Sequence, residues 1–220
     1  MSEAFVFVDD LDAPVLTLDD RHHLDRVLRI RAGAPITIAD GRGRSRPARF
    51  GPSLVVDGEI VEEPAAAVEL TVGCALAKGD KTEWAVQKLT ELGIDTIIPF
   101  TADRCIVRWE PERVAHHTNR LRKVAREAAM QCRRPRLPNV ADLARFDELV
   151  TRPAVALADR GGAPISAGDT TILVGPEGGW SPRECSAAAK FVGLGAYVLR
   201  AETAAVAAGV LLASGPNRSS

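Results

Sequence analysis

The residues best suited to chemistry lie in the last fifty positions of the chain, in two stretches that combine glycine with charged side chains. The first stretch is GPEGG at residues 175–179, and the second is LGAYVLRAET at residues 194–203. Glu177 and Glu202 could each accept a proton, and Arg200 could stabilise an oxygen on which negative charge develops. Acidic residues also stabilise the start of a helix, so a structural role stays open for both glutamates beside the catalytic one.

Each stretch is expected to connect a short buried strand to a helix. Residues 171–174 are mostly apolar, and Ser181, Pro182 and Glu184 form a capping box for a helix that begins after the glycines. The second unit would have its strand at residues 196–199 and its Ala-rich helix from Thr203. Open α/β sheets bind ligands in loops at the carboxyl ends of their strands. The dinucleotide and P-loop glycine spacings are absent, so the glycines indicate either another kind of ligand loop or plain turns.

Positive charge is concentrated in two segments of a chain whose net charge is −1. Residues 21–49 contain eight arginines and two aspartates, and residues 104–136 contain nine arginines and a lysine against three glutamates. The rest of the chain is therefore strongly acidic. Such asymmetry is typical of a surface that binds a polyanion, although solvated helix faces can also be charged without a partner.

Composition indicates an ordinary globular protein, with 46% hydrophobic residues. The longest weakly apolar run, residues 204–213, is shorter than the roughly 18–20 residues that cross a bilayer, and the polar beginning of the chain lacks a signal-peptide pattern. We therefore expect no membrane association and a cytoplasmic location. The four cysteines form no CxxC pair, and the adjacent histidines 22–23 and 116–117 lack further ligands, so no metal site is expected.

The chain divides at the polar segment EEPA, residues 62–65, into two expected domains. Residues 1–65 contain the short apolar runs FVFV, APVLTL and PITIAD, a helix at HHLDRVLRI, and a hairpin signal at Asp57-Gly58 between SLVV and EIVEE. Residues 66–220 alternate strands and helices, with strands at ELTVGCALA, IDTIIPF, RCIV and PAVALAD. Helices are expected at KTEWAVQKLTELG, from Pro111 to Cys132, and at residues 146–150. This alternation predicts a mostly parallel sheet covered on both faces.

Five motifs in this order resemble one family over essentially the whole chain. They are HLDRVLRIRAG with ADGRG, KGDKTEWAVQKLTELGI, REAAMQCRRPRLP, LVGPEGGWSPRE and LGAYVLRAETA. The chain resembles the bacterial 16S rRNA uridine N3-methyltransferases of the SPOUT superfamily. It departs from the family pattern at Cys132, where serine is usual, and at Ala201, where threonine is usual. Cys132 weakens any hydrogen bond made there, and Ala201 could contribute only its backbone.

The resemblance implies an α/β protein of the SPOUT type, with a deep C-terminal trefoil knot in residues 66–220 and a small PUA-like β-barrel that binds RNA in residues 1–65. It also implies a homodimer and a bent S-adenosylmethionine molecule held among three loops, without a metal. The cofactor residues would be Leu157, Val174, Gly175, Pro176, Glu177, Gly178, Gly179, Leu194, Gly195, Leu199, Arg200, Ala201, Glu202, Thr203 and Ala204.

The expected activity is methylation of N3 of the uridine at position 1498 in 16S rRNA of the small ribosomal subunit. Methyl transfer needs alignment and removal of the N3 proton, and the candidate catalytic residues are Glu177, Arg200, Glu202 and Arg134. A SPOUT enzyme that methylates a ribose 2′-hydroxyl, and a noncatalytic RNA-binding ribosome factor, are the alternatives. The candidate RNA-binding residues are Arg21, Arg26, Arg29, Arg31, Lys78, Lys81, Lys88, Arg120, Lys123, Arg126 and Arg134.

Two aromatic residues and the lysines allow a second interpretation each. The lysines of the KGDKTEWAVQK segment could contact phosphate or simply form a solvated helix face. Trp109 and Trp180 could stack on a base or pack inside the protein, and Trp84 is expected in the core.

Overall fold

The computed structural model describes residues 4–215, which form two compact units. Of the described residues, one unit comprises 4–65 together with Arg126–Leu137, and the other comprises Ala66–Ala125 and 138–215. Residues 126–137, which the expected C-terminal domain included, belong to the N-terminal unit. In the structure, Ala129 of that segment is fully buried against Phe7 and Ala39.

The N-terminal unit is built on a five-stranded sheet with the order β1-β2-β3-β4, in which β5 also pairs with β3. β1 runs parallel to β2, and the other pairs are antiparallel. The strands are β1 (Ala4–Phe7), β2 (Pro35–Ala39), β3 (Arg44–Arg49), β4 (Val55–Val56) and β5 (Val61–Glu62). The expected helix is present as α1 (Leu18–His22), which continues into a π-helical turn, η1 (His23–Val27). Leu24 on this turn packs with Ile36 and Ile38 of the sheet.

Two expectations for this unit are wrong. The Asp57-Gly58 turn does not join a hairpin, because β4 and β5 both pair with β3 and not with each other. The run APVLTL forms no strand. Its Thr17 instead caps α1, since the Thr17 hydroxyl accepts a hydrogen bond from the Asp20 backbone N–H at 3.1 Å.

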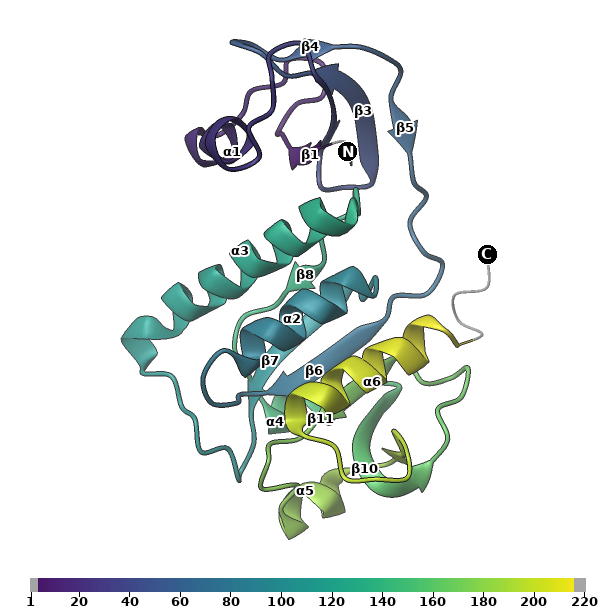
Figure 1. Ribbon diagram of the computed structural model, residues 1–220. Coiled ribbons are helices and arrows are strands. Elements are labelled where there is room, and N and C mark those ends of the chain that lie inside the picture. Colours follow the sequence, from purple (N-terminus) through teal and green to yellow (C-terminus); the bar gives the residue numbers. More distant parts are fainter. Residues whose placement is uncertain (1–3, 216–220) are drawn as a thin grey trace. The chain divides into compact units, whose positions relative to one another are not determined.

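The C-terminal unit contains a seven-stranded sheet in which every pairing is parallel (Figure 1). The strand order is β12-β10-β11-β6-β7-β8, and β9 pairs with β7. The strands are β6 (Thr71–Ala75), β7 (Thr96–Thr101), β8 (Asn139–Val140), β9 (Ala144–Arg145), β10 (Val155–Ala163), β11 (Thr171–Val174) and β12 (Phe191–Val192). The expected mostly parallel α/β sheet is thus confirmed.

Both faces of this sheet are buried, as successive strand residues point to opposite sides. In β11, Ile172 and Val174 belong to one apolar cluster and Leu173 to another. The first cluster receives side chains from α2, α3 and α6, and the second from α4 and from Trp180, which precedes α5. The helices are α2 (Lys81–Glu91), the 3-10 turn η2 (Pro111–Arg113), α3 (Val114–Cys132), α4 (Phe146–Leu149), α5 (Pro182–Ala187) and α6 (Ala201–Ala213).

Several local expectations for this unit are confirmed. Gly93, with φ 81°, follows the end of α2, as its C-cap role requires. Ser181 caps α5 and forms the capping box with Glu184. Pro111 opens the helical segment that continues as α3, whose Leu121 and Ala125 are buried.

Three other expectations are wrong. Residues 196–199 form no strand; the strand is β12, before Gly193, and Tyr197 and Val198 are 84% and 78% exposed. Residues 104–107 form a turn after β7 and not a strand. Trp84 is 41% exposed, because α2 presents it away from the residues buried in the core, such as Ala85 and Leu89. Across residues 4–215, none of the helices has the length and apolar character needed to span a membrane.

Candidate functional site

The three segments expected to hold a ligand leave the sheet from one edge. The central strand of the three is β10, and its Ala158 is in register with Val174 of β11 and with Val192 of β12. Because the strands are parallel, the residues that follow these positions emerge side by side. Those residues are 159–162, 175–179 and 193–199, so the parallel register brings together segments separated by up to forty positions in the chain.

Glycines allow two of these segments to approach each other at backbone distance. Ala158 and Ala163 both pair with Val192, so the residues between them bulge out of β10. A Cβ atom on Gly162 would lie 2.5 Å from the backbone carbon of Val192, and one on Gly193 would lie 2.8 Å from the Gly162 carbonyl oxygen. Only glycine fits at both positions.

The GPEGG loop is closed by its own backbone and fastened by the tryptophan that follows it. The Gly179 N–H donates to the Pro176 carbonyl at 2.8 Å, and Gly179 has a left-handed φ of 67°. The buried Trp180 ring stacks on Phe100 with ring centroids 6.2 Å apart and also contacts Phe146, at 5.6 Å. Its indole N–H donates to the Ala158 carbonyl at 2.9 Å. Trp180 therefore packs inside the protein, which answers the question that the sequence left open.

A small pocket lies where this loop meets the beginning of α6. Lys81 lines this pocket, and its Nζ atom is 3.0 Å from Glu177 Oε1 and 3.6 Å from Glu202 Oε2. The Glu202 Oε2 atom is buried and forms no hydrogen bond with the described residues. The lining residues are Cys74, Ala75, Ala77, Lys81, Thr82, Ala85, Val174, Gly175, Ala201, Glu202 and Ala205.

The electrostatics around Lys81 distinguish the two glutamates that this lysine contacts. A backbone hydrogen bond at Glu177 and then the hydrogen bond from Lys81 lower the pKa of the Glu177 carboxyl, against the effect of burial. The hydrogen bond to Glu177 raises the pKa of Lys81. Glu177 is therefore ionised and already paired, which makes it a weak proton acceptor. Glu202 keeps an oxygen without a hydrogen bond.

The other expected cofactor residues differ in what they can offer. Leu157 is fully buried in the sheet core, so a ligand could meet only its backbone. Leu194 and Leu199 are half-buried, and Gly195 and Thr203 are exposed. Helix α6 begins at Ala201, two residues earlier than expected, and the N-cap residue Arg200 makes no side-chain capping bond.

Many of the expected RNA-binding cations already have partners. Arg126 donates to both carboxylate oxygens of Asp20 at 2.8 Å, and Arg21 donates to the carbonyls of Gly51 and Pro52. Three more ion pairs are Lys81 with Glu177, Lys88 with Glu91, and Arg120 with Glu83. Arg26 lies 3.4 Å from Asp25, with both side chains largely exposed. Among the expected RNA-binding residues, Arg29, Arg31, Lys78 and Lys123 are exposed and form no salt bridge or side-chain hydrogen bond with the described residues.

Arg134, expected in both the catalytic and the RNA-binding set, is half-buried just after α3, in the N-terminal unit. Its role stays a prediction. Trp109 stacks on His117 with ring centroids 4.8 Å apart. No cluster of three potential metal ligands occurs in the described part of the chain.

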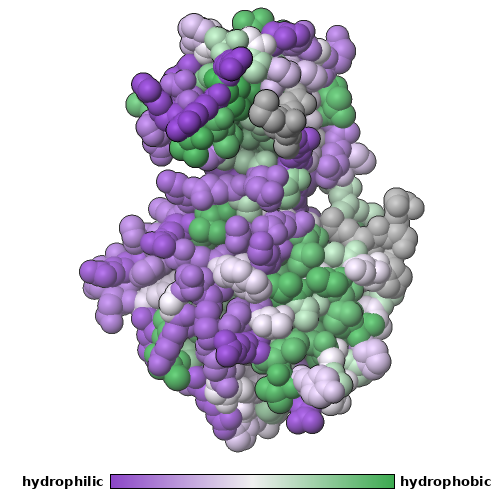
Figure 2. Space-filling model, in the orientation of Figure 1, coloured by the Kyte–Doolittle hydropathy of each residue, from purple (hydrophilic) through white to green (hydrophobic). Residues whose placement is uncertain are grey.

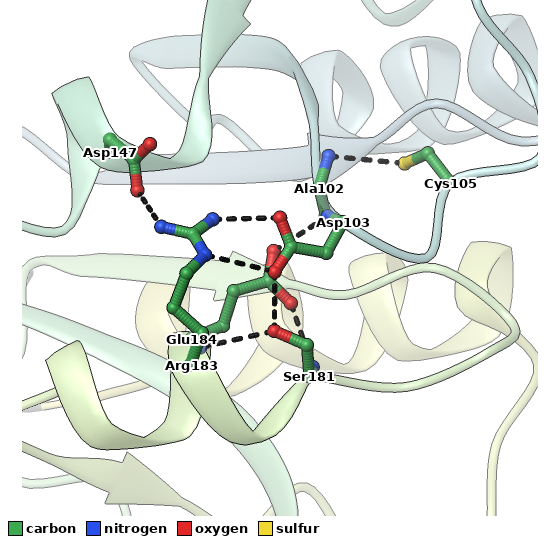
Figure 3. Close-up of polar contacts among 7 residues, drawn as sticks. All are labelled: Ala102, Asp103, Cys105, Asp147, Ser181, Arg183 and Glu184. Atoms are coloured by element: carbon green, nitrogen blue, oxygen red, sulfur yellow. Dashed lines mark hydrogen bonds and ion pairs between the residues drawn. The ribbon is translucent and has the colours of Figure 1, made fainter.

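The sequence did not reveal a polar network beside the GPEGG loop (Figure 3). Asp103, in the turn after β7, accepts hydrogen bonds from Ser181 and Arg183 at the beginning of α5. The neighbouring Arg104 donates to the Gly178 carbonyl at 3.1 Å. The capping-box signal marked Ser181 and Glu184, but nothing in the sequence linked them to a residue about eighty positions earlier.

Comparison with known proteins gives consistent matches. A family model described as an RNA methyltransferase domain matches residues 64–213. The ribosomal RNA small subunit methyltransferase E of Mycobacterium tuberculosis (strain CDC 1551 / Oshkosh) is 32% identical, over 86% of this chain and 82% of that protein. The protein of the same name from Bacillus subtilis (strain 168) is 28% identical, over 88% and 87%.

Solved structures of methyltransferases are also similar to this chain. The ribosomal RNA small subunit methyltransferase E from Neisseria gonorrhoeae, bound to S-adenosyl methionine, has a TM-score of 0.78 and 28% identity, with coverage of 95% of this chain and 96% of that one. A putative methyltransferase from Legionella pneumophila, in complex with the bound cofactor SAM, has a TM-score of 0.84 with 24% identity, over 98% and 99% of the two chains. The second likeness concerns the fold alone.

Proposed function

The chain belongs to the family described as an RNA methyltransferase domain and, within it, to the ribosomal RNA small subunit methyltransferase E proteins, and we propose that it transfers a methyl group from S-adenosylmethionine to N3 of the uridine at position 1498 of 16S rRNA. The observation that carries the proposal is the register of β12, β10 and β11. It aligns Ala158, Val174 and Val192, so that the three segments after them emerge side by side, as one donor site would require.

The residues present fit a donor such as S-adenosylmethionine. An adenine ring needs an apolar slot with backbone donors and acceptors, which Leu194, Leu199 and the main chain around Gly175 offer. The buried Oε2 atom of Glu202, which forms no hydrogen bond with the described residues, can accept one from a ligand N–H or O–H group. When bound, the donor supplies a methyl group on a positively charged sulfur, which needs no metal or covalent nucleophile.

We assign the proton-accepting role to Glu202 in preference to Glu177. Glu177 is held by Lys81 at 3.0 Å, whereas Glu202 Oε2 lies 3.6 Å from the same amine and has no hydrogen bond. Arg200, exposed directly before α6, would stabilise the uracil oxygen on which charge develops. Arg134 stays a separate proposal. Glu202→Gln should then lower kcat much more than Glu177→Gln, and equal losses would contradict the assignment.

RNA binding is proposed for the exposed cations. Arg29, Arg31, Lys78 and Lys123 have no salt bridge in the described structure, so their charge is available for phosphate. Residues 1–65 would act as the PUA-like barrel of this fold, and residues 66–220 would contain the trefoil knot. Replacing Arg29 and Arg31 by alanine should weaken RNA binding and reduce its dependence on salt concentration. An unchanged salt dependence would argue against this surface.

A homodimer is supported by the apolar surface of the C-terminal unit. Helix α6 is almost entirely apolar, and Val210 and Leu211 remain about 40% exposed. Tyr197 and Val198 are also exposed, and Figure 2 shows hydrophobic residues gathered over α6. A helix that is apolar on all sides is normally buried, and we propose that a second copy of the chain covers it.

The activity is tested in two steps. Calorimetric titration with S-adenosylmethionine should give saturable binding that S-adenosylhomocysteine competes for; absence of both would refute the methyltransferase proposal. Mass spectrometry of small-subunit RNA from a deletion strain should show the loss of N3-methyluridine. Its retention would refute the assigned atom, and loss of a ribose 2′-O-methyl group instead would point to the other reaction.

A further inference from the structure

We propose that Asp103 and Arg183 are positioning residues for the methyl-donor site, because they join the turn after β7 to the beginning of α5 and so fix the GPEGG loop between them. The inference rests on the proposed function, since it assumes that this loop binds the donor. Neither residue was among the catalytic, cofactor-binding or RNA-binding residues expected from the sequence.

The contacts form a closed ring around the Asp103 carboxylate (Figure 3). Arg183 binds it with two nitrogens, Nη2 to Oδ1 at 2.7 Å and Nε to Oδ2 at 3.0 Å. The Ser181 hydroxyl donates to Oδ2 at 2.5 Å. The Asp103 backbone N–H donates to Glu184 Oε1 at 2.8 Å, and Glu184 Oε2 accepts the Ser181 backbone N–H, also at 2.8 Å. The planar guanidinium of Arg183 and the planar carboxylate of Asp103 are joined by two hydrogen bonds, and this bidentate contact resists rotation of either group.

The ring is anchored in the protein interior. Glu184 is fully buried, and both of its oxygens are used within the ring. Helix α5 is therefore tied at its first turn to a residue that is not its neighbour in sequence. Because Ser181 follows the GPEGG loop by two residues, any movement of the first turn of α5 moves the end of the loop.

The turn after β7 also holds the middle of the GPEGG loop. Arg104 donates from Nη1 to the Gly178 carbonyl at 3.1 Å, and a Cβ atom on Gly178 would lie 3.1 Å from Arg104 Cβ. In the sheet, β6 lies between β11 and β7, so the turn reaches the loop across the end of one intervening strand. The glycines of the loop have no side chains to anchor it, and the support must come from neighbouring elements.

The Asp103 carboxylate stays ionised at neutral pH. The hydrogen bonds from Arg183 and then Ser181 lower the pKa of Asp103 to about 2. Arg183 also contacts Asp147 Oδ1 of α4 at 2.5 Å. Asp147 is half exposed and touches neither Ser181 nor the loop through any described hydrogen bond, so it serves as a matched control on the same arginine.

The experiment compares Asp103→Asn with Asp147→Asn in the full-length protein. Hydrogen–deuterium exchange should show faster exchange of the loop backbone at residues 177–181 in Asp103→Asn and unchanged exchange in Asp147→Asn. We also expect Asp103→Asn to raise the Kd and the KM for S-adenosylmethionine by about tenfold, within the range of a lost charge-assisted hydrogen bond. The kcat at saturating donor should change by less than about twofold, since the chemical groups remain.

Two results would overturn the inference. One is unchanged loop exchange and unchanged Kd in Asp103→Asn; the other is an equal rise of Kd in both variants, which would indicate general destabilisation. If Asp103→Asn does not fold, Arg183→Lys at the exposed end of the pair must show the same increases in exchange and Kd, although smaller, or the inference is wrong. If wild-type protein shows no donor binding, the proposed function fails, while the exchange measurement still decides whether the ring holds the loop.

Discussion

Replacing Gly175 with alanine tests how rigidly the loop is packed. An added Cβ atom would lie 3.0, 3.1 and 3.2 Å from three carbons of the Trp180 ring. These distances are roughly half an ångström shorter than the 3.5–4.0 Å at which carbon atoms pack best. The ring cannot easily move away, because it is stacked on Phe100, packed against Phe146 and hydrogen-bonded to the Ala158 carbonyl.

The expected cost follows from two opposing effects. Alanine restricts the unfolded chain and thereby stabilises by about 0.4–1 kcal/mol where the backbone permits it. Overpacking a rigid core costs about 1–3 kcal/mol. Gly168 provides the matched control, because an added Cβ there meets nothing within 4 Å and its φ is not in the left-handed region. The difference between the two variants therefore isolates the overpacking, which we place at about 2 kcal/mol.

Thermal unfolding without ligand is the assay. With about 2–4 °C per kcal/mol for a protein of this size, Gly175→Ala should melt about 4–8 °C below Gly168→Ala. Gly168→Ala should melt at or slightly above the wild-type temperature. If both alanine variants have the same melting temperature, the Trp180 ring is free to move, and the reasoning that this ring fastens the loop is refuted.

Three further predictions concern charges and the exposed helix. Burial alone would raise the pKa of Asp20, but hydrogen bonds from Arg126 and Thr17 lower it; Asp20→Asn should therefore cost about 1–2 kcal/mol of unfolding free energy at pH 7, discounted because Arg126 is partly exposed. The difference in unfolding free energy between wild type and Asp20→Asn is fully present above the unfolded-state pKa near 4 and should disappear as the pH falls through the lower folded-state pKa of Asp20. Denaturant titrations that give the same difference at pH 2.5 and at pH 7 would contradict the ion pair. Lys81→Met should raise the pKa of Glu177 toward its ordinary value, measurable by carboxyl NMR titration; an unchanged pKa would show that Lys81 does not lower it and would leave the backbone hydrogen bond and the charge of Lys78 as its causes. Leu211→Glu should convert a dimer to a monomer in sedimentation velocity, and a dimer that persists would place the interface elsewhere.

Local signals in the sequence were sufficient for the elements that border the loop. The capping box of Ser181 and Glu184, and the glycine at residue 93 after α2, both act within a few residues. Such signals depend on backbone groups that have no other partner, and the structure therefore follows them closely.

Other features depend on residues distant in the chain, and for these the sequence pattern gave either a wrong prediction or none. Residues 196–199 have the composition of a strand, but β10 is already paired on both sides, with β11 and with β12. The apolar side chains of Tyr197 and Val198 are left on the surface, where α6 is also apolar. The ion pair of Arg126 with Asp20 joins positions 106 apart, and no periodicity could reveal that this arginine is occupied.

The loop is thus held by residues that do not belong to it. Trp180 fastens it to β10, the turn at Asp103 and Arg104 fastens it to the end of β7, and Lys81 binds its glutamate from α2. Glycines let a ligand approach the backbone closely, and the same absence of side chains leaves the loop with few side-chain contacts of its own. Trp180 and the turn at Asp103 and Arg104 fix geometry without contacting Glu202 or Arg200, so the loss of either support should weaken donor binding more than it slows the transfer step. Substitutions at Glu202 or Arg200 should do the reverse, and the ratio of the two effects separates residues that position the donor from residues that act on the proton.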